Sequence, residues 1–266
     1  MTFFLSCNYY INQFVEGLRK QDTIMQEIEK SKEKYEIEPV NAEITNNTII
    51  PGITGVKIDT DKSYHNMKQY GSYNEAMTVL KEINPEITVN NYYDKYIEEG
   101  NKNKRQVAFL IVVNQNLERV ISLLEKNNIK GTIFLDGQDL ETSSRAISKA
   151  NNHEYEILSY QKEYSPSFLK TSISYLESIT RKKGKYCYTE EENQNLLDFC
   201  KKEKLHTIKK ESIKEKLYQE VKKTLKSGQI YAIELNEETE KEFSTTIRYM
   251  KQKGYEFVTL NELLKE

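Results

Sequence analysis

The sequence lacks the short motifs by which many enzyme classes are identified. It has no Trp, and its three His and three Cys residues form no HxxxH, HExxH or CxxC pair, so the common zinc-site patterns are absent. A P-loop, a GxGxxG fingerprint and a GxSxG nucleophile elbow are absent as well. The sequence therefore indicates no metal or nucleotide cofactor, and no serine hydrolase of the GxSxG type.

The chain also lacks an excess of one charge. Its 39 basic and 41 acidic side chains leave a net charge of −2 over 266 residues, and Lys and Glu are spread along the sequence. Nucleic-acid binding normally needs a concentrated basic surface, so we expect no nucleic-acid partner. The aromatic residues are 19 Tyr and 9 Phe. They could stack on sugars, although packing is the commoner role of any single Tyr.

Residues 1–40 combine an uncharged start with a helical pattern. No charged side chain precedes Glu16. This start is too short and polar to span a bilayer and lacks the basic beginning of a signal peptide. It is either the remnant of a membrane anchor or an ordinary amphipathic helix. Apolar residues from Ile11 to Tyr35 recur at 3–4 spacing, which predicts a helix or short coiled coil and then a linker. Residues 41–105 form a small appended region.

From residue 106 onward, seven strand-like segments alternate with helical patterns. They are VAFLIVV, GTIFL, EYEIL, YCYT, LHTIK, IYAIEL and FVTL. Such alternation is typical of parallel strands with helices outside them. We therefore predict an α/β fold in which residues 106–266 form a seven-stranded (β/α) barrel, with an open doubly wound sheet as the alternative.

Three helix starts are indicated by capping patterns. They are Ser165-Pro166, Thr189 with Glu192, and Ser212 with Glu215.

In a parallel barrel, functional side chains lie at the carboxyl ends of the strands. We expect ligand-binding candidates there, from the strand ends and from the loop QKEYSPS: Asp136, Tyr160, Tyr164, Glu190 and Glu234. No His lies among them. Asp136 and Glu190 stand at helix starts, where an acid also has a structural role.

Cys187 and Cys200 lie on the fourth strand and on the helix that follows it. A disulfide needs Cα atoms within about 7 Å, which this placement allows. Two buried free thiols are the equal alternative.

The segments around the strands resemble the polysaccharide deacetylase family, the family four carbohydrate esterases with a NodB-type homology domain. GTIFLDG is similar to that family's ATFFxxG strand, and NNHEYEILSYQK to its GHEIGNHTYSH segment. KSGQIYAIEL is similar to GSIILLHD, and MKQKGYEFVTLNELL to the closing LKxKGYxFVTLxELL. The resemblance covers about residues 106–264 and implies a deacetylase-type barrel and a link to cell-surface polysaccharide.

The family's catalytic positions carry other residues in this sequence. By the resemblance, its general base and metal-binding Asp fall on Val112 and Val113, its metal-binding His residues on Leu158 and Lys162, and its acid His on Glu234. Val, Leu and a cationic Lys cannot hold the divalent metal that this chemistry needs. We expect no catalytic residue and no metal at these positions, and an ion pair between Lys162 and Glu234 where the side chains reach each other.

Three functions are consistent with this pattern. The first is a degenerate deacetylase of the cell envelope that binds glycan or a partner without turnover. The second is an active hydrolase with a rebuilt site that uses Asp136, Glu190 and Glu234. The third is a structural protein anchored through its N-terminus. We expect an extracytoplasmic location and membrane attachment through the N-terminus.

Overall fold

The chain folds into two compact units. The computed structural model describes residues 17–113, 116–150, 152–159 and 165–266. The first unit is formed by the residues up to Asn41 together with Ile53–Glu86, and the second by Ala42–Gly52 together with Ile87–Glu266. These units divide the chain differently from the segments 1–40, 41–105 and 106–266, since residues 41–105 contribute to both.

The first unit consists of a helix pair and a two-stranded antiparallel sheet. Its elements are α2 (Thr23–Tyr35), β3 (Gly55–Ile58), α3 (Thr60–Tyr70), η1 (Glu75–Met77) and β4 (Leu80–Ile83), with β3 and β4 antiparallel. Asp22 caps α2 by accepting a hydrogen bond from the Ile24 backbone N–H at 2.9 Å. The apolar stripe of α2 is buried in this unit's own core, where Ile28 and Met67 are fully buried. The apolar pattern of the sequence corresponds to helix α2 over Thr23–Tyr35. The part of the pattern before residue 17 lies outside the described residues.

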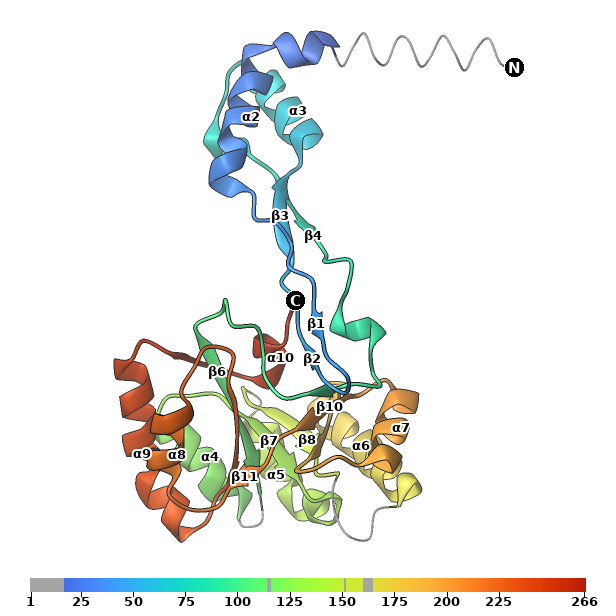
Figure 1. Ribbon diagram of the computed structural model, residues 1–266, viewed down its shortest axis with the longest axis vertical. Helices are drawn as coiled ribbons and strands as arrows, with labels where there is room; N and C mark the ends of the chain where they lie inside the picture. The colour runs from blue at the N-terminus through green and yellow to red at the C-terminus, as the bar shows by residue number, and fades with distance from the viewer. Residues whose placement is uncertain (1–16, 114–115, 151, 160–164) are drawn as a thin grey trace, which may run out of the picture. The chain divides into compact units, whose positions relative to one another are not determined.

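The second unit contains the parallel strands, with helices outside them (Figure 1). Its main strands are β6 (Gln106–Val112), β7 (Thr132–Leu135), β8 (Glu154–Ile157), β9 (Tyr186–Thr189), β10 (His206–Lys209), β11 (Ser212–Ile213), β12 (Ile230–Glu234) and β13 (Glu256–Val258). Its helices are α4 (Leu117–Lys126), α5 (Leu140–Lys149), α6 (Pro166–Thr180), α7 (Gln194–Glu203), α8 (Leu217–Thr224), α9 (Glu237–Gln252) and α10 (Leu260–Leu263). Shorter elements are β1 (Glu43–Ile44), β2 (Ile49–Ile50), η2 (Val89–Asn91), β5 (Tyr96–Ile97) and η3 (Gly137–Asp139).

All seven expected strands form, and they pair in parallel. One sheet has the order β11-β12-β6-β7-β8, with β13 also beside β6, and the other has the order β5-β10-β9. The α/β class is thus confirmed. The two sheets share one inner core, in which Phe134 of β7 and Tyr188 of β9 lie with ring centroids 5.6 Å apart.

Ser159 connects the two sheets by hydrogen bonds. This buried residue follows β8, and its hydroxyl donates to the Tyr188 carbonyl at 3.1 Å and accepts from the Tyr188 N–H at 2.7 Å. Both bonds lie where the edge strands β8 and β9 face each other. The hydroxyl therefore satisfies backbone groups of β9 that no strand ladder pairs at this point.

Two of the three expected helix caps are wrong. Helix α6 does begin at Pro166, after Ser165. Thr189 instead ends β9 and donates to the Glu191 carbonyl at 2.7 Å, while Asn193 caps α7. Ser212 lies in β11, and α8 begins only at Leu217. In a Glu-rich chain the Ser/Thr-x-x-Glu spacing recurs without a helix start, and strand pairing decides the outcome here.

A disulfide joins Cys187 of β9 to Cys200 of α7, with Cα atoms 6.4 Å apart. Both residues are buried in the outer core, where the helices pack on the strands. The bond fastens α7 to the strand that precedes it.

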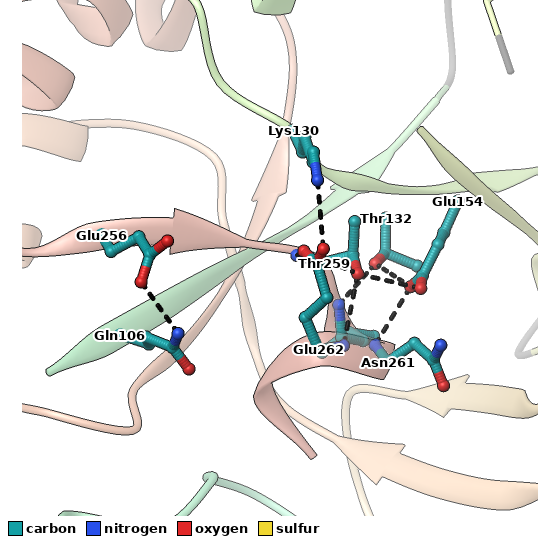
Figure 2. Close-up of polar contacts among 9 residues, drawn as sticks. Gln106, Lys130, Thr132, Glu154, Glu256, Thr259, Asn261 and Glu262 are labelled. Atoms are coloured by element: carbon teal, nitrogen blue, oxygen red, sulfur yellow. Dashed lines mark hydrogen bonds and ion pairs between the residues drawn. The ribbon is translucent and has the colours of Figure 1, made fainter. Parts of the chain in front are cut away.

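The amino-terminal ends of the strands are held by a polar cluster around Glu154 (Figure 2). Its carboxylate accepts hydrogen bonds from the Thr132 hydroxyl at 2.9 Å, the Thr259 hydroxyl at 2.9 Å and the Asn261 backbone N–H at 3.1 Å. The Thr132 hydroxyl in turn accepts from the Leu260 N–H at 2.8 Å. Glu154 thereby fixes the start of α10 against β7 and β8.

Candidate functional site

Val112 and Val113 lie on opposite sides of the end of β6. Successive strand residues point to opposite faces, so Val112 joins the inner core between the sheets and Val113 joins the outer core beneath the helices. Only 2% of Val112 and 6% of Val113 is exposed. Neither position has a group that can ligate a metal or exchange a proton, and both are used for packing.

Leu158 extends the apolar surface around Val112. It follows β8, is half-buried, and packs against the same inner core that contains Val112. Two positions that the family resemblance assigns to the catalytic site therefore contribute to a continuous apolar core. In the part of the chain that the structure describes, no three His, Cys, Asp or Glu side chains lie close enough to hold a metal ion.

Glu190 and Glu234 are brought together by Lys214. The Lys214 ammonium lies 3.4 Å from Glu190 Oε2 and 3.9 Å from Glu234 Oε2. Glu190 also accepts a hydrogen bond from the Ser212 hydroxyl. Glu234 is the residue paired with Val112 in the β6–β12 ladder, so this polar cluster borders the apolar valine directly.

The segment that contains Lys214 is held by a hydrogen bond from the side-chain amide of Asn236 to its backbone. The Asn236 amide donates to the Lys214 carbonyl at 2.7 Å, and Asn236 also caps α9 through the backbone N–H groups of Glu238 and Thr239. Short strand β11 pairs with β12 just before this segment. The position of the lysine is thus set by the end of β12.

A second lysine binds carboxylates at the end of β10. The Lys209 ammonium lies 2.9 Å from Glu98 Oε1 and 3.1 Å from Glu192 Oε1, and 5.2 Å from the centre of the Tyr96 ring. At both β9–β10 and β12, carboxylates at the carboxyl ends of strands are therefore matched by lysine side chains.

Of the other candidate residues, Asp136 has a structural role. It directly follows β7 and caps η3 by accepting from the Gln138 N–H at 2.9 Å. Tyr160, Lys162 and Tyr164 lie outside the described residues, so the expected pair of Lys162 with Glu234 stays a prediction. The lysine observed beside Glu234 is Lys214.

Sequence reasoning missed Lys214 because the segment that carries it was assigned to a helix start. The pattern KKESIKEK offers many lysines and glutamates with no signal that separates one from another. Only the pairing of β11 with β12 selects Lys214.

Comparison with known proteins gives few matches in sequence and many in structure. No family model matches the chain. The uncharacterized protein YlxY of Bacillus subtilis (strain 168) is 32% identical over 141 residues, which are 52% of this chain and 44% of that protein. The match thus spans less than half the length of this curated relative.

Solved structures match nearly the whole chain. Wild-type BA3943 of Bacillus anthracis, a CE4 family pseudoenzyme, is 26% identical with a TM-score of 0.69, over 92% of this chain and 96% of that one. A BA3943 mutant with restored enzymatic activity is 25% identical with a TM-score of 0.67, over 92% and 99%.

A further match, to a family 4 carbohydrate esterase, shows similarity in fold only. Bacillus subtilis PdaA is 16% identical with a TM-score of 0.54, over 85% of this chain and 97% of that one. Among the described residues, no helix combines the length and apolar character that crossing a bilayer requires. The expected resemblance is confirmed: the chain has the fold of the family 4 carbohydrate esterases and is similar over most of its length to a pseudoenzyme of that family.

Proposed function

We propose that this protein is a catalytically inactive relative of the polysaccharide deacetylases that binds acetylated cell-envelope polysaccharide without turnover. The proposal rests on one observation: at the carboxyl ends of the strands, other residues replace those that the family resemblance assigns to catalysis and metal binding. Val112 and Leu158 are part of the inner apolar core, and Lys214 supplies a positive charge between Glu190 and Glu234. A metal-dependent deacetylation needs a divalent cation to polarise the acetyl group and activate water, and these side chains provide no ligand set for one.

The ligand class is supported by the site and by the structural relatives. Lysine-bridged carboxylates and neighbouring hydroxyls suit a sugar, because each can donate to or accept from a ring hydroxyl. The similar BA3943 protein is itself a pseudoenzyme, so the fold persists without activity in that relative. We place the protein outside the cytoplasm, attached through its N-terminus. The Cys187–Cys200 disulfide supports the location, since such bonds persist in oxidising compartments.

A rebuilt hydrolase is the second candidate. The meeting of Glu190 and Glu234 around one lysine favours it, because two carboxylates in different environments can divide acid and base roles. The two candidates differ in one measurable respect, which is the release of acetate.

The test measures binding and turnover on the same material. Purified protein is incubated with N-acetylated chito-oligomers and with peptidoglycan, with and without zinc or cobalt. Isothermal titration calorimetry follows binding, and a coupled assay follows acetate. Binding without acetate release supports the inactive binder. Acetate release that the Glu234→Ala variant abolishes would establish the hydrolase, and absence of binding to either glycan would reject both. Fractionation of the native host tests the location separately.

A further inference from the structure

A pocket lies at the amino-terminal ends of the strands, opposite the ends that carry the candidate site. It has a volume of about 640 Å³, within the range typical of small-molecule sites. It is lined by the starts of β8 and β9 and by the ends of α5 and α6, within the second unit. Its walls carry the side chains of Ser148, Tyr155, Thr180, Tyr186 and Asn261, among others.

The rim of this pocket is positively charged. The segment RKKGK after α6 contributes Arg181, Lys182, Lys183 and Lys185, all with exposed side chains. Arg181 and Lys183 form no ion pair with any residue that the structure describes. The Lys185 ammonium donates to the Asn261 side-chain oxygen at 2.6 Å and forms no ion pair with a described carboxylate. The helix dipole favours a basic residue at the carboxyl end of α6. It does not explain why four basic residues line one pocket.

A buried imidazole lines the same pocket. His153 is 1% exposed, and neither ring nitrogen has a hydrogen-bond partner among the described residues. A buried polar group without a partner is disfavoured by roughly 1–3 kcal/mol, so such groups call for an explanation. Burial lowers the pKa of His153, and the neutral ring offers one donor and one acceptor.

The two carboxyl groups that line the pocket do not neutralise its rim. Glu154 accepts hydrogen bonds from Thr132, Thr259 and the Asn261 N–H, as Figure 2 shows, and its single negative charge does not offset the four basic side chains of the rim. Burial raises the pKa of Glu156 to about 8, so this group is largely uncharged at neutral pH. The local balance therefore stays positive.

We propose that this pocket binds an anionic sugar, whose phosphate or carboxylate group is held by Arg181, Lys183 and Lys185 and hydrogen-bonded by the His153 ring. The pocket exceeds the size of a bare anion, and its hydroxyl, amide and tyrosine side chains suit a sugar ring. This site goes beyond the proposed function, because it lies at the other ends of the strands and needs none of the residues around Lys214.

Calorimetry on the intact chain tests the proposal. Glucose 6-phosphate and glucuronate are titrated in low salt, with glucose as the neutral control. We expect at least one of the two anionic sugars to bind and glucose not to bind, and the stronger one identifies the phosphate or the carboxylate as the recognised group. Binding of glucose with equal affinity, or of none of the three, would overturn the proposal.

Variants then locate the binding. Arg181→Ala with Lys183→Ala should weaken the anionic sugar about tenfold or more, since two charge-assisted contacts are removed. The control, Lys222→Ala with Lys241→Ala, removes the same charge from exposed positions on α8 and α9 that do not line the pocket. Equal weakening in both double variants would indicate general electrostatic attraction and would refute a built site.

The His153 ring provides a readout that does not depend on a variant's folding. The imidazole C–H signals of the three His residues are assigned by NMR in the unmodified protein. Saturating anionic sugar should shift the signals of His153 and leave those of His65 unchanged, because His65 does not line the pocket. A bound sugar that leaves the His153 signals in place would show that the ligand lies elsewhere.

Discussion

Val112 and Glu234 lie side by side in the parallel ladder of β6 and β12. One is 2% exposed and packs in the inner core, while the carboxylate of the other turns to Lys214, 3.9 Å away. An apolar residue and an ion pair thus occupy neighbouring positions at the carboxyl ends of the strands. The ion pair thus belongs to the polar surface, and Val112 belongs to the buried apolar core directly beside it.

Replacing Lys214 by Ala should change the free energy of unfolding little, and the variant should be as inactive as the wild type. Its side chain is 53% exposed, and ion pairs of this kind contribute below about 1 kcal/mol. We expect a small decrease in the urea midpoint, comparable with that of the exposed control Lys222→Ala. Acetate release should stay at background in both. A decrease in the free energy of unfolding far above 1 kcal/mol would show that the lysine supports the site structurally.

Restoring the family's residues should introduce metal binding. The variant Val112→Asp, Val113→Asp, Leu158→His and Lys162→His supplies the carboxylates and imidazoles that the resemblance assigns to these positions. Without metal, buried unpaired carboxylates should lower the free energy of unfolding by roughly 3 kcal/mol or more. Zinc should recover part of this loss, because it binds only the folded state. Thermal unfolding with and without zinc measures both effects.

The matched control for this variant keeps Val112 and Val113 and carries only the two histidines. It should show a much smaller response to zinc, because it lacks the carboxylate that is one of the three metal ligands assigned by the resemblance. Equal zinc stabilisation of both proteins would contradict the assignment of the valine positions.

The parallel strands could be predicted from the sequence because their signal is local. Val107–Val113 is a continuous apolar run followed by a helical pattern, and a strand buried on both faces requires such a run. The family resemblance rests on similar local segments. The division of the chain into units was less predictable, since residues 42–52 return to the second unit only through pairing such as Thr48 with Tyr96.

The polar contacts of the candidate site depend on residues far apart in sequence. Glu190 and Glu234 were expected as separate strand-end acids, but their connection through Lys214 requires β11 to pair with β12. The basic pocket likewise depends on bringing His153 beside the loop that contains Arg181. Neither follows from periodicity, because charged side chains at exposed positions carry no signal of their partners.

Ser159→Ala should loosen the junction between β8 and β9. The substitution removes the hydroxyl that pairs with both backbone groups of Tyr188 and leaves them without this partner in a buried place. We expect a loss of about 2 kcal/mol in the free energy of unfolding. Ser174→Ala is the control, because its hydroxyl donates to the Lys170 carbonyl on the exposed face of α6. Urea denaturation of both proteins checks the difference, and equal midpoints would contradict the role of Ser159.

Reducing the Cys187–Cys200 bond should destabilise the second unit. The cross-link closes a short loop, for which the expected contribution is about 3 kcal/mol. The double variant Cys187→Ser and Cys200→Ser should therefore unfold at lower temperature than the oxidised protein, and dithiothreitol should shift only the latter. Mass spectrometry of non-reduced protein from its native compartment gives the redox state, and two free thiols there would contradict the bond.

Glu156 should make stability decrease as the pH rises. Burial is the main cause that raises its pKa from 4.5 to about 8, while the backbone N–H groups of Lys185 and Tyr186 oppose the shift. Between these two pH values the folded protein retains a proton that the unfolded chain has lost. The stabilising contribution is therefore complete below pH 4.5 and is lost as the pH rises to 8, by an amount on the order of 5 kcal/mol.

The variant Glu156→Gln isolates this effect, because the amide cannot ionise and its oxygen can still accept from the Lys185 N–H, now 3.0 Å from Glu156 Oε1. Urea midpoints of the wild type and the variant should lie close together at pH 5. At pH 9 the variant should be clearly the more stable protein. Glu141→Gln, on the exposed face of α5, should show no such divergence. Parallel stability curves for the wild type and Glu156→Gln from pH 5 to 9 would mean that the Glu156 carboxyl is already ionised in the folded protein at pH 5.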